Sequence, residues 1–236
     1  MGYANYLLEL LFPPRCTLCG ELMDADKDKR CFCERCRGVW EQEKLVLCPC
    51  CRRDPQHCGC IPKYNKNRAA DSFRSLVFYD SENVKKLIHK LKTEQNAALT
   101  ALMARELAAA VMKYNVIDED TVLAYPQRSA SSIKKYGKDH AEQLCRRVSK
   151  LTGIPVFAGI RHRRGAEQKT LTAKERGPNA AQSYYIPDKY KNDIKNKRII
   201  FIDDVVTTGA TSVVSAALCK ANGAKSFSVI SVAKTP

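Results

Sequence analysis

The fold is decided by residues Ile199–Thr211, which read IIFIDDVVTTGAT. Four apolar residues predict a buried parallel strand, the carboxylates of Asp203 and Asp204 end it, and a turn rich in threonine and glycine opens a helix. At the start of such a helix, free backbone N–H groups and the positive end of the helix dipole favour a phosphate. Gly209 allows the backbone to approach that phosphate closely, because glycine has no side chain.

The two carboxylates are expected to bind a different part of the ligand than the turn binds. Negative side chains directly before the turn repel a phosphate, but one ribose length away they can accept hydrogen bonds from vicinal hydroxyls. We therefore expect Asp203 and Asp204 to bind a sugar, and the hydroxyls of Thr207, Thr208 and Thr211 to add donors to the phosphate. An N-terminal helix-cap pair and a metal site are the alternatives for the two acids. A Walker A loop and a dinucleotide fingerprint are excluded, because their glycine motifs are missing.

The rest of the chain after residue 71 alternates between strand and helix patterns. Apolar runs predict the strands Ser72–Tyr79, Thr121–Tyr125, Ile154–Phe157, Arg198–Ile202 and Ser226–Val232. Helical periodicity predicts the helices Asn83–Leu91, Ala97–Tyr114, Asp139–Leu151 and Ala210–Ala221. This order predicts an α/β fold with a mainly parallel, twisted sheet flanked by helices. Ligands are then expected at the carboxyl ends of the strands.

The chain has 236 residues and a formal charge of +15, and the charge is unevenly distributed. Before Ile61 nine Lys and Arg residues balance nine Asp and Glu residues, whereas after it 31 basic residues face 16 acidic ones. A basic surface favours anionic ligands such as pyrophosphate, nucleotides or nucleic acid. Two predicted loops, Gln127–Lys138 and Gly159–Tyr185, are rich in Lys and Arg, so we expect an anion-binding rim there. A solvated basic surface is the alternative.

The first part of the chain holds ten of the twelve cysteines. The apolar start of the chain resembles neither a secretory signal nor a membrane-spanning helix, so we expect reduced thiols, a cytoplasmic location and no membrane insertion. Closely paired cysteines then predict zinc sites. The simplest pairing gives two sites of four thiolates, made by Cys16, Cys19, Cys33 and Cys36 and by Cys48, Cys51, Cys58 and Cys60.

The choice of ligands has alternatives. The knuckles can also pair in a cross-braced order, Cys31 and Cys50 are surplus, and His57 precedes Cys58. Four thiolates close the coordination shell of zinc, so we expect two structural ions rather than a catalytic one. The chain is accordingly divided into a zinc-ribbon module, residues 1–62, and an α/β domain, residues 63–236.

The run Ile199–Thr211 resembles the 5-phosphoribosyl-1-pyrophosphate (PRPP) motif of type I phosphoribosyltransferases. Together the two modules resemble the competence protein F (ComF) family, in which an N-terminal zinc ribbon precedes a phosphoribosyltransferase-like domain. Residues 10–16 (LLFPPRC), the helix end near Leu91 and residues 168–176 (QKTLTAKER) with Asn179 carry further resemblance. Residues 136–140 depart from the family, since they read YGKDH where RGFNQ is usual, and the ligand of this loop is left open.

The resemblance implies a phosphoribosyltransferase-like fold and a PRPP site around the turn. The implied PRPP-binding residues are Asp203, Asp204, Val205, Val206, Thr207, Thr208, Gly209, Ala210, Thr211 and Arg128. Asp203 and Asp204 are also the catalytic candidates, and the resemblance implies Mg²⁺ between the pyrophosphate and the ribose hydroxyls. Gln127 precedes Arg128 in the loop where the resemblance implies binding of pyrophosphate. Lys92 falls where the family tends to have lysine, and a solvated lysine is the alternative. His140 and His162 are expected on the surface, and no general base is assigned.

Two functions of different classes follow from the resemblance. The first is a PRPP-binding protein of competence and DNA uptake, which binds single-stranded DNA through its basic loops and Tyr136, Tyr184 and Tyr185 and has a DNA-uptake helicase or channel protein as partner. The second is a catalytically active PRPP-dependent phosphoribosyltransferase of nucleotide metabolism, with an unnamed acceptor. A glutamine-dependent amidotransferase is not expected, because the chain shows no N-terminal nucleophile domain. A fold relic without either activity is the third alternative.

Overall fold

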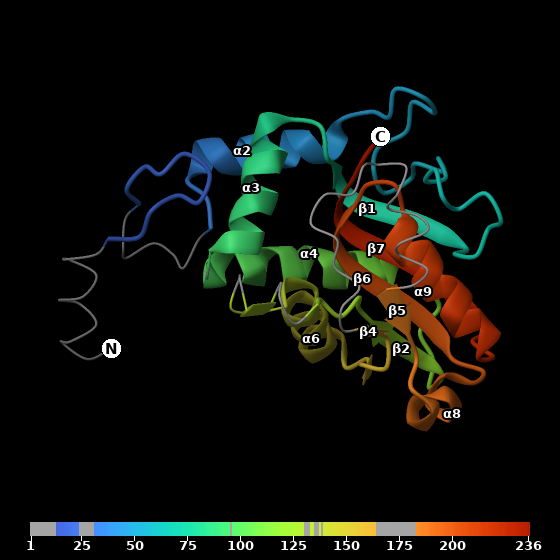
Figure 1. Ribbon diagram of the computed structural model, residues 1–236. Coiled ribbons are helices and arrows are strands. Elements are labelled where there is room, and N and C mark those ends of the chain that lie inside the picture. Colours follow the sequence, from blue (N-terminus) through green and yellow to red (C-terminus); the bar gives the residue numbers. More distant parts are fainter. Residues whose placement is uncertain are drawn as a thin grey trace, which may run out of the picture.

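The computed structural model describes residues 13–23, 31–94, 96–129, 133–134, 137, 139–163 and 183–236. Its centre is a five-stranded sheet in the order β1-β7-β6-β2-β3, in which every neighbouring pair is parallel (Figure 1). The strands are β1 (Ser72–Phe78), β2 (Thr121–Ala124), β3 (Val156–Phe157), β6 (Arg198–Val206) and β7 (Ser226–Lys234). The expected α/β fold with a parallel sheet is confirmed.

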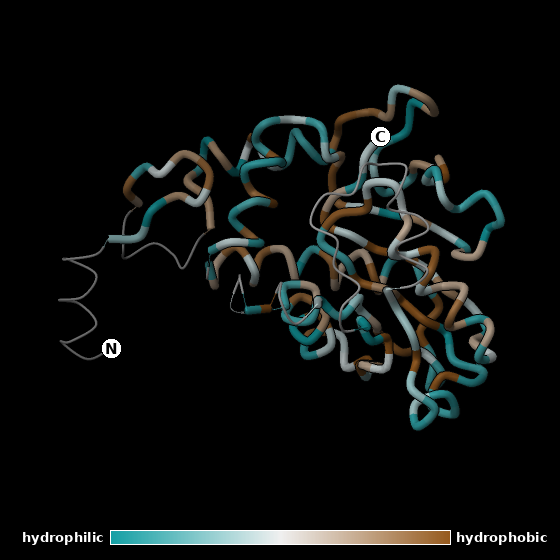
Figure 2. Tube along the Cα trace, in the orientation of Figure 1, coloured by the Kyte–Doolittle hydropathy of each residue, from teal (hydrophilic) through white to brown (hydrophobic). Residues whose placement is uncertain are grey.

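Helices cover both faces of this sheet. One face is covered by α3 (Glu82–Thr93), α4 (Ala97–Tyr114) and α6 (His140–Thr152), and the other by α8 (Lys191–Ile194) and α9 (Ala210–Ala221). Residues of β6 alternate between the two cores, with Ile200 and Ile202 in the first and Ile199 and Phe201 in the second. The apolar run is continuous because both faces of the strand are buried, and Figure 2 shows hydrophobic residues gathered along the strands.

The predicted end of β6 at Ile202 is wrong. The strand continues to Val206, and Val205 and Val206 pair with Ala233 and Lys234 of β7. Since β-branched residues suit a strand, the two valines extend the ladder past the acids. Asp203 and Asp204 therefore lie inside the strand, before its end at Val206.

Some elements of the structure have no counterpart in the sequence prediction. They are α2 (Glu34–Leu45), the antiparallel pair β4 (Arg161–His162) and β5 (Tyr184–Tyr185), and the short 3₁₀ helix η1 (Asp188–Tyr190) with α8. Helix α2 is hard to recognise because most of its residues are polar, and only Cys36 and Trp40 are buried. The described helices include none that is long and apolar enough to cross a bilayer.

Trp40 joins the first cysteines to the α/β domain. Its side chain is 2% exposed and packs beside Leu87, Leu91 and Met103 of α3 and α4. The indole N–H donates to Glu106 Oε1 at 2.8 Å. One hydrophobic core thus contains residues from both sides of the boundary at residues 62 and 63, and the division into two domains stays a prediction.

Candidate functional site

The eight paired cysteines form two groups, and within each group all four sulfurs lie within 4.8 Å of one another. The first group is Cys16, Cys19, Cys33 and Cys36, and the second is Cys48, Cys51, Cys58 and Cys60. Sulfurs at about 2.3 Å from one tetrahedral zinc ion stand about 3.8 Å apart. The Sγ–Sγ distances are 3.8 Å for Cys19–Cys33, 3.8 Å for Cys48–Cys60 and 3.5 Å for Cys51–Cys58. Both groups can therefore hold zinc, and the sequential pairing is confirmed.

The surplus residues lie outside both groups. The thiol of Cys31 is buried and donates to Thr17 Oγ1 at 3.4 Å, and burial raises its pKa to about 11. Cys31 lies outside the first group and its thiol is bonded to Thr17, so it packs as a small buried residue. Cys50 is exposed. His57 does not join the second group, because its Nδ1 lies 2.8 Å from Asp54 Oδ2.

Asp203 and Asp204 lie in the central strand β6, with side chains on opposite faces of the sheet. Both are almost buried, with 8% and 6% of their surface exposed. Burial, and to a smaller extent the neighbouring Asp204 carboxylate, raises the pKa of Asp203 to about 8. Burial therefore favours the protonated form of Asp203 in the free protein.

Asp204 is bound by two cations. Lys92 Nζ from α3 lies 3.3 Å from Asp204 Oδ1, and Arg128 Nη2, after β2, donates to Asp204 Oδ2 at 3.1 Å. The structure thus brings Lys92 and Arg128 together on Asp204, so the solvated alternative does not describe Lys92. In the free protein the Asp204 carboxylate is engaged by these cations rather than open to a sugar.

Asp139 positions the loop that carries Arg128, and its role was not predicted. Its carboxylate caps α6 by accepting from the Glu142 backbone N–H at 3.2 Å, and it accepts from the Arg128 backbone N–H at 2.7 Å. Burial raises the pKa of Asp139. An acid followed three residues later by glutamate is a helix-capping pattern, and this signal was present in the sequence. The expected surface position of the next residue, His140, is wrong, since only 2% of it is exposed.

The turn after β6 leaves donor groups at the start of α9. Gly209 is the N-cap with a left-handed φ of 77°, and no side chain caps the helix. A Cβ at this position would lie 2.6 Å from Pro62 Cβ, so both the conformation and the space require glycine. Thr207 is exposed, and the carbonyl of Thr208 accepts from the Tyr64 backbone N–H at 3.2 Å.

The two tyrosines of β5 have different surroundings. Tyr184 is half-buried, and burial, with a smaller contribution from Asp203, raises the pKa of its hydroxyl. Arg163 lies over the ring of Tyr185 at 5.0 Å. The ring of Tyr184 lies edge-on to His162, 5.2 Å between the centroids. Other residues expected near the site lie outside the described residues, namely residues 10–12, Tyr136, Lys138, residues 168–176 and Asn179.

The second cysteine group lies beside this turn. Lys234 at the end of β7 is 3% exposed, and its Nζ donates to the Cys58 carbonyl at 3.2 Å. Phe78 at the end of β1 packs against Cys48 and Cys58. Because Pro62 follows this group directly and contacts Gly209, the candidate ligand site and the second cysteine group share a boundary.

No family model matches the chain. Competence protein F from Haemophilus influenzae (strain ATCC 51907 / DSM 11121 / KW20 / Rd) is 24% identical over 199 residues, which cover 76% of this chain and 86% of that protein. The expected resemblance to competence protein F is confirmed. Two cysteine groups ahead of a parallel α/β sheet agree with it.

Solved structures similar to the chain include glutamine phosphoribosylpyrophosphate amidotransferase from B. subtilis, complexed with ADP and GMP. Its TM-score is 0.37 at 19% identity, over 56% of this chain and 25% of that chain. The chain therefore spans a quarter of the length of that protein. An alanine mutant from an analysis of an invariant aspartic acid in HPRTs has a TM-score of 0.34 at 12% identity, over 65% of this chain and 79% of that chain.

Proposed function

We propose that the protein binds PRPP, or a related phosphoribosyl ligand, at the carboxyl end of β6 and acts in competence and DNA uptake. The observation that carries the proposal is that two cations, Lys92 and Arg128, converge on the carboxylate of Asp204, in the strand that leads to an uncapped helix start. Such a set offers acceptors for ribose hydroxyls, cations for pyrophosphate and N–H donors for the 5-phosphate. The similarity to competence protein F supports the role in DNA uptake.

Ligand binding exchanges the partners of Asp204. Pyrophosphate carries more negative charge than a single carboxylate, so it competes for Lys92 and Arg128. Once these cations turn to the pyrophosphate, the Asp204 oxygens accept from ribose hydroxyls. Carboxylate and phosphate oxygens suit Mg²⁺, which would neutralise charge on the bound pyrophosphate. Asp139 keeps Arg128 within reach of both partners, because it holds the Arg128 backbone N–H.

The two zinc ions are proposed to be structural, since each group supplies four thiolates and leaves no ligand position open. Their thiolates require reducing conditions, which supports the proposed cytoplasmic location. We expect the protein to lose its fold when a chelator removes the zinc. We do not expect metal exchange at these sites to produce substrate turnover.

Calorimetric titration with PRPP tests the ligand. We expect Mg²⁺-dependent binding to the wild type and a loss of roughly tenfold or more in affinity for Asp204→Asn, because charged hydrogen bonds contribute about 1.5–3 kcal/mol. The matched control is Asp193→Asn, an exposed acid of α8 away from the site. If the wild type shows no Mg²⁺-dependent heat, the proposed ligand is wrong.

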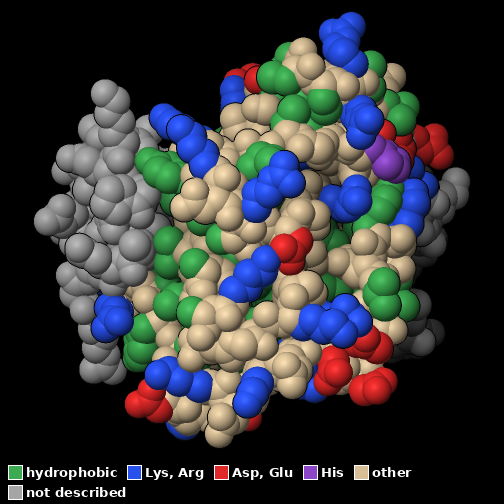
Figure 3. Space-filling view, turned by 90° about the vertical axis from the view of Figure 1, so that its right-hand side faces the viewer, with side chains coloured by type: hydrophobic (Ala, Val, Ile, Leu, Met, Phe, Trp, Pro, Cys, Tyr) green, Lys and Arg blue, Asp and Glu red, His purple; other side chains and the backbone are tan. Residues whose placement is uncertain are grey.

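Binding of single-stranded DNA is the second part of the proposal, with a DNA-uptake helicase or channel protein as partner. Figure 3 shows Lys and Arg side chains spread across one face of the molecule, and the chain carries a formal charge of +15. In an electrophoretic assay, binding of a single strand should weaken steeply with salt, in proportion to the phosphates neutralised. Absent or salt-independent binding would argue against this part.

A catalytic phosphoribosyl transfer is the second candidate function, and the position of Asp203, almost buried next to Asp204 near the carboxyl end of β6, favours it together with its raised pKa. Carboxyl groups that titrate near neutral pH are concentrated at catalytic sites. The test is release of pyrophosphate from PRPP and Mg²⁺ with candidate acceptors. Turnover above the hydrolysis background, absent from Asp203→Asn, is the expected result for an enzyme; no turnover with any acceptor leaves only the binding function.

A further inference from the structure

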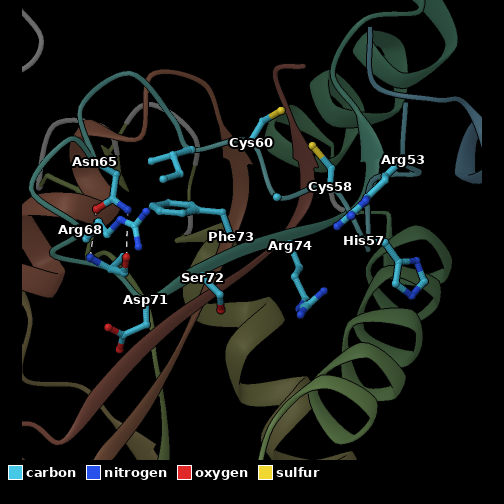
Figure 4. A pocket seen from close by; sticks show the side chains of 13 residues that line it. Arg53, His57, Cys58, Cys60, Asn65, Arg68, Asp71, Ser72, Phe73 and Arg74 are labelled. Carbon is cyan, nitrogen blue, oxygen red and sulfur yellow. Dashed lines mark hydrogen bonds between the residues drawn. The ribbon is translucent and has the colours of Figure 1, made fainter. Parts of the chain in front are cut away.

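A cavity of about 360 Å³ opens between the second cysteine group and the start of β1. Figure 4 shows its lining, with Arg53 and His57 on one side, Arg68 and Asp71 on the other, and β1 running between them. No residue from the turn after β6 lines it. The cavity therefore adjoins the candidate phosphoribosyl site, since Phe73 of its lining would lie 3.9 Å from a Cβ on Gly209, but the turn itself is not part of its wall.

Three arginines from three segments line the cavity, namely Arg53, Arg68 and Arg74. Arg53 and Arg68 are exposed, and Arg74 is half-buried. In the part of the chain that the structure describes, none of the three forms an ion pair with a carboxylate. Three unneutralised guanidinium groups around one cavity attract an anion, and their planar N–H donors match phosphate oxygens.

The acid in the lining does not cancel this charge. Asp71 is already bound on another side, by Lys220 Nζ at 2.5 Å and by the Phe227 backbone N–H at 2.7 Å. His57 likewise has its own partner in Asp54. Four thiolates and one Zn²⁺ leave two negative charges on the second group, which lines the cavity through Cys58 and Cys60, so the three arginines keep a smaller net positive charge there.

Two of these arginines are held in place before any ligand arrives. Arg74 Nη1 donates to the Gln56 carbonyl at 2.5 Å, and its guanidinium lies over the ring of Tyr114, 4.5 Å from the centroid. Arg74 uses one of five N–H donors in that bond. Arg68 has a left-handed φ of 49°, and buried Asn65 closes its loop by two hydrogen bonds to the backbone of Ala70, at 2.9 and 3.0 Å.

Apolar surface lies next to the arginines. Ile61 is 49% exposed, and the ring of Phe73 forms part of the wall. A cavity of this volume falls within the range of sites for small ligands. Positive charge beside apolar surface fits a ligand that joins a phosphate to a flat or sugar-like group.

We propose that this cavity binds a nucleotide, whose phosphate is attracted by the arginines that line it, Arg53, Arg68 and Arg74, and whose nucleoside lies against Ile61 and Phe73. A free nucleotide and a nucleotide unit of a single strand present the same chemistry to it. This site is additional to the proposed phosphoribosyl site, and neither depends on the other.

Arg68→Gly tests the proposal with a matched control. Glycine favours the left-handed conformation of residue 68, so the substitution removes the guanidinium without straining the loop. Arg52→Gly is the control, because Arg52 is also an exposed arginine with a left-handed φ, of 56°, and does not line the cavity. Zinc content verifies that both variants keep the second cysteine group, and Arg53→Ala supplies a second variant.

The probes are dTMP and a short oligothymidylate, titrated into the full-length, zinc-loaded protein. We expect Arg68→Gly and Arg53→Ala to weaken binding roughly tenfold, while Arg52→Gly stays within about twofold. Weaker binding of dTMP by these variants would show that a free nucleotide is a sufficient ligand. Weaker binding of the oligothymidylate alone would show that the ligand is a nucleotide unit of a strand. Equal binding by Arg68→Gly and Arg52→Gly with both probes would overturn the proposal.

A second comparison separates this site from the phosphoribosyl site. Arg68→Gly should bind PRPP as the wild type does, whereas Asp204→Asn should keep its affinity for the cavity probe. Failure of PRPP to bind the wild type leaves the cavity result unchanged. Loss of the cavity probe in Asp204→Asn would show that the nucleotide binds at β6 and would overturn the separate site.

Discussion

The two cysteine groups share one metal chemistry but are attached to the α/β domain in different ways. The first is attached through apolar packing, because Trp40 of α2 is buried against α3 and α4. The second packs on Phe78 and is also bound at the carboxyl ends of the strands, where Lys234 Nζ donates to the Cys58 carbonyl and Pro62 lies against Gly209. The difference indicates that the first group supports stability, whereas the second also shapes the ligand turn.

Removing one zinc ion at a time is the strongest test of this difference. We expect Cys36→Ser and Cys58→Ser each to halve the zinc content and to lower the free energy of unfolding by several kcal/mol, since the metal contributes folding energy. Only Cys58→Ser should also weaken PRPP binding, by roughly tenfold, because its group adjoins the turn. Metal analysis and calorimetry measure both effects. Equal losses of PRPP affinity in the two variants would remove the distinction.

The apolar attachment of the first group predicts the next largest effect. Trp40→Ala removes a buried indole and its hydrogen bond to Glu106, and we expect a loss of about 3–5 kcal/mol in urea unfolding. PRPP affinity should stay unchanged at temperatures where the variant is folded. Leu45→Ala, a residue of the same helix that is 72% exposed, is the control and should change stability by about 0.5 kcal/mol or less. A Trp40→Ala variant as stable as the control would contradict the described packing.

Buried acids make the second half of the molecule sensitive to pH. Because the folded pKa of Asp203 is raised to about 8, the folded state keeps a proton that the unfolded state loses near pH 4. The stabilisation is complete below pH 4 and declines as pH rises to about 8. Between pH 5 and pH 7 the wild type should lose about 2 kcal/mol relative to Asp203→Asn. Parallel slopes of unfolding free energy against pH in both proteins would contradict this.

The smallest expected effect concerns the polar contact of the second group. Lys234→Met keeps an apolar stem but removes the bond to the Cys58 carbonyl, and we expect a loss of about 1–2 kcal/mol. In chelator competition the second zinc ion should leave at a roughly tenfold lower chelator concentration than in the wild type. Lys225→Met, an exposed lysine, is the control. Identical competition curves for the two variants would show that Lys234 does not support the second group.

Much of the fold could be predicted because its signals are local. The helices Ala97–Tyr114 and Ala210–Ala221 match their predicted bounds, and cysteine spacing predicted the membership of both sulfur groups. A strand–turn–helix pattern likewise identified the acids and the glycine of the candidate site. These features depend on neighbours in the sequence, which periodicity and spacing can reveal.

The rest depends on residues that are far apart in the chain. The continuation of β6 past the acids requires pairing with β7, and the partners of Asp204 come from α3 and from the loop after β2. The burial of His140 and the contact between Lys234 and Cys58 are similar cases. Local composition contains no information on such contacts, so the electrostatics of the site were available only from the structure.

The place of β7 between β1 and β6 has a consequence for protein synthesis. Strand β1 is made early and has β7, a late segment, as its neighbour in the described sheet. A nascent chain on the ribosome therefore presents an unpaired apolar strand for most of its translation, and such edges promote aggregation. We expect the sheet to close only when Ser226–Lys234 has left the ribosomal exit tunnel and is free to pair with β1 and β6.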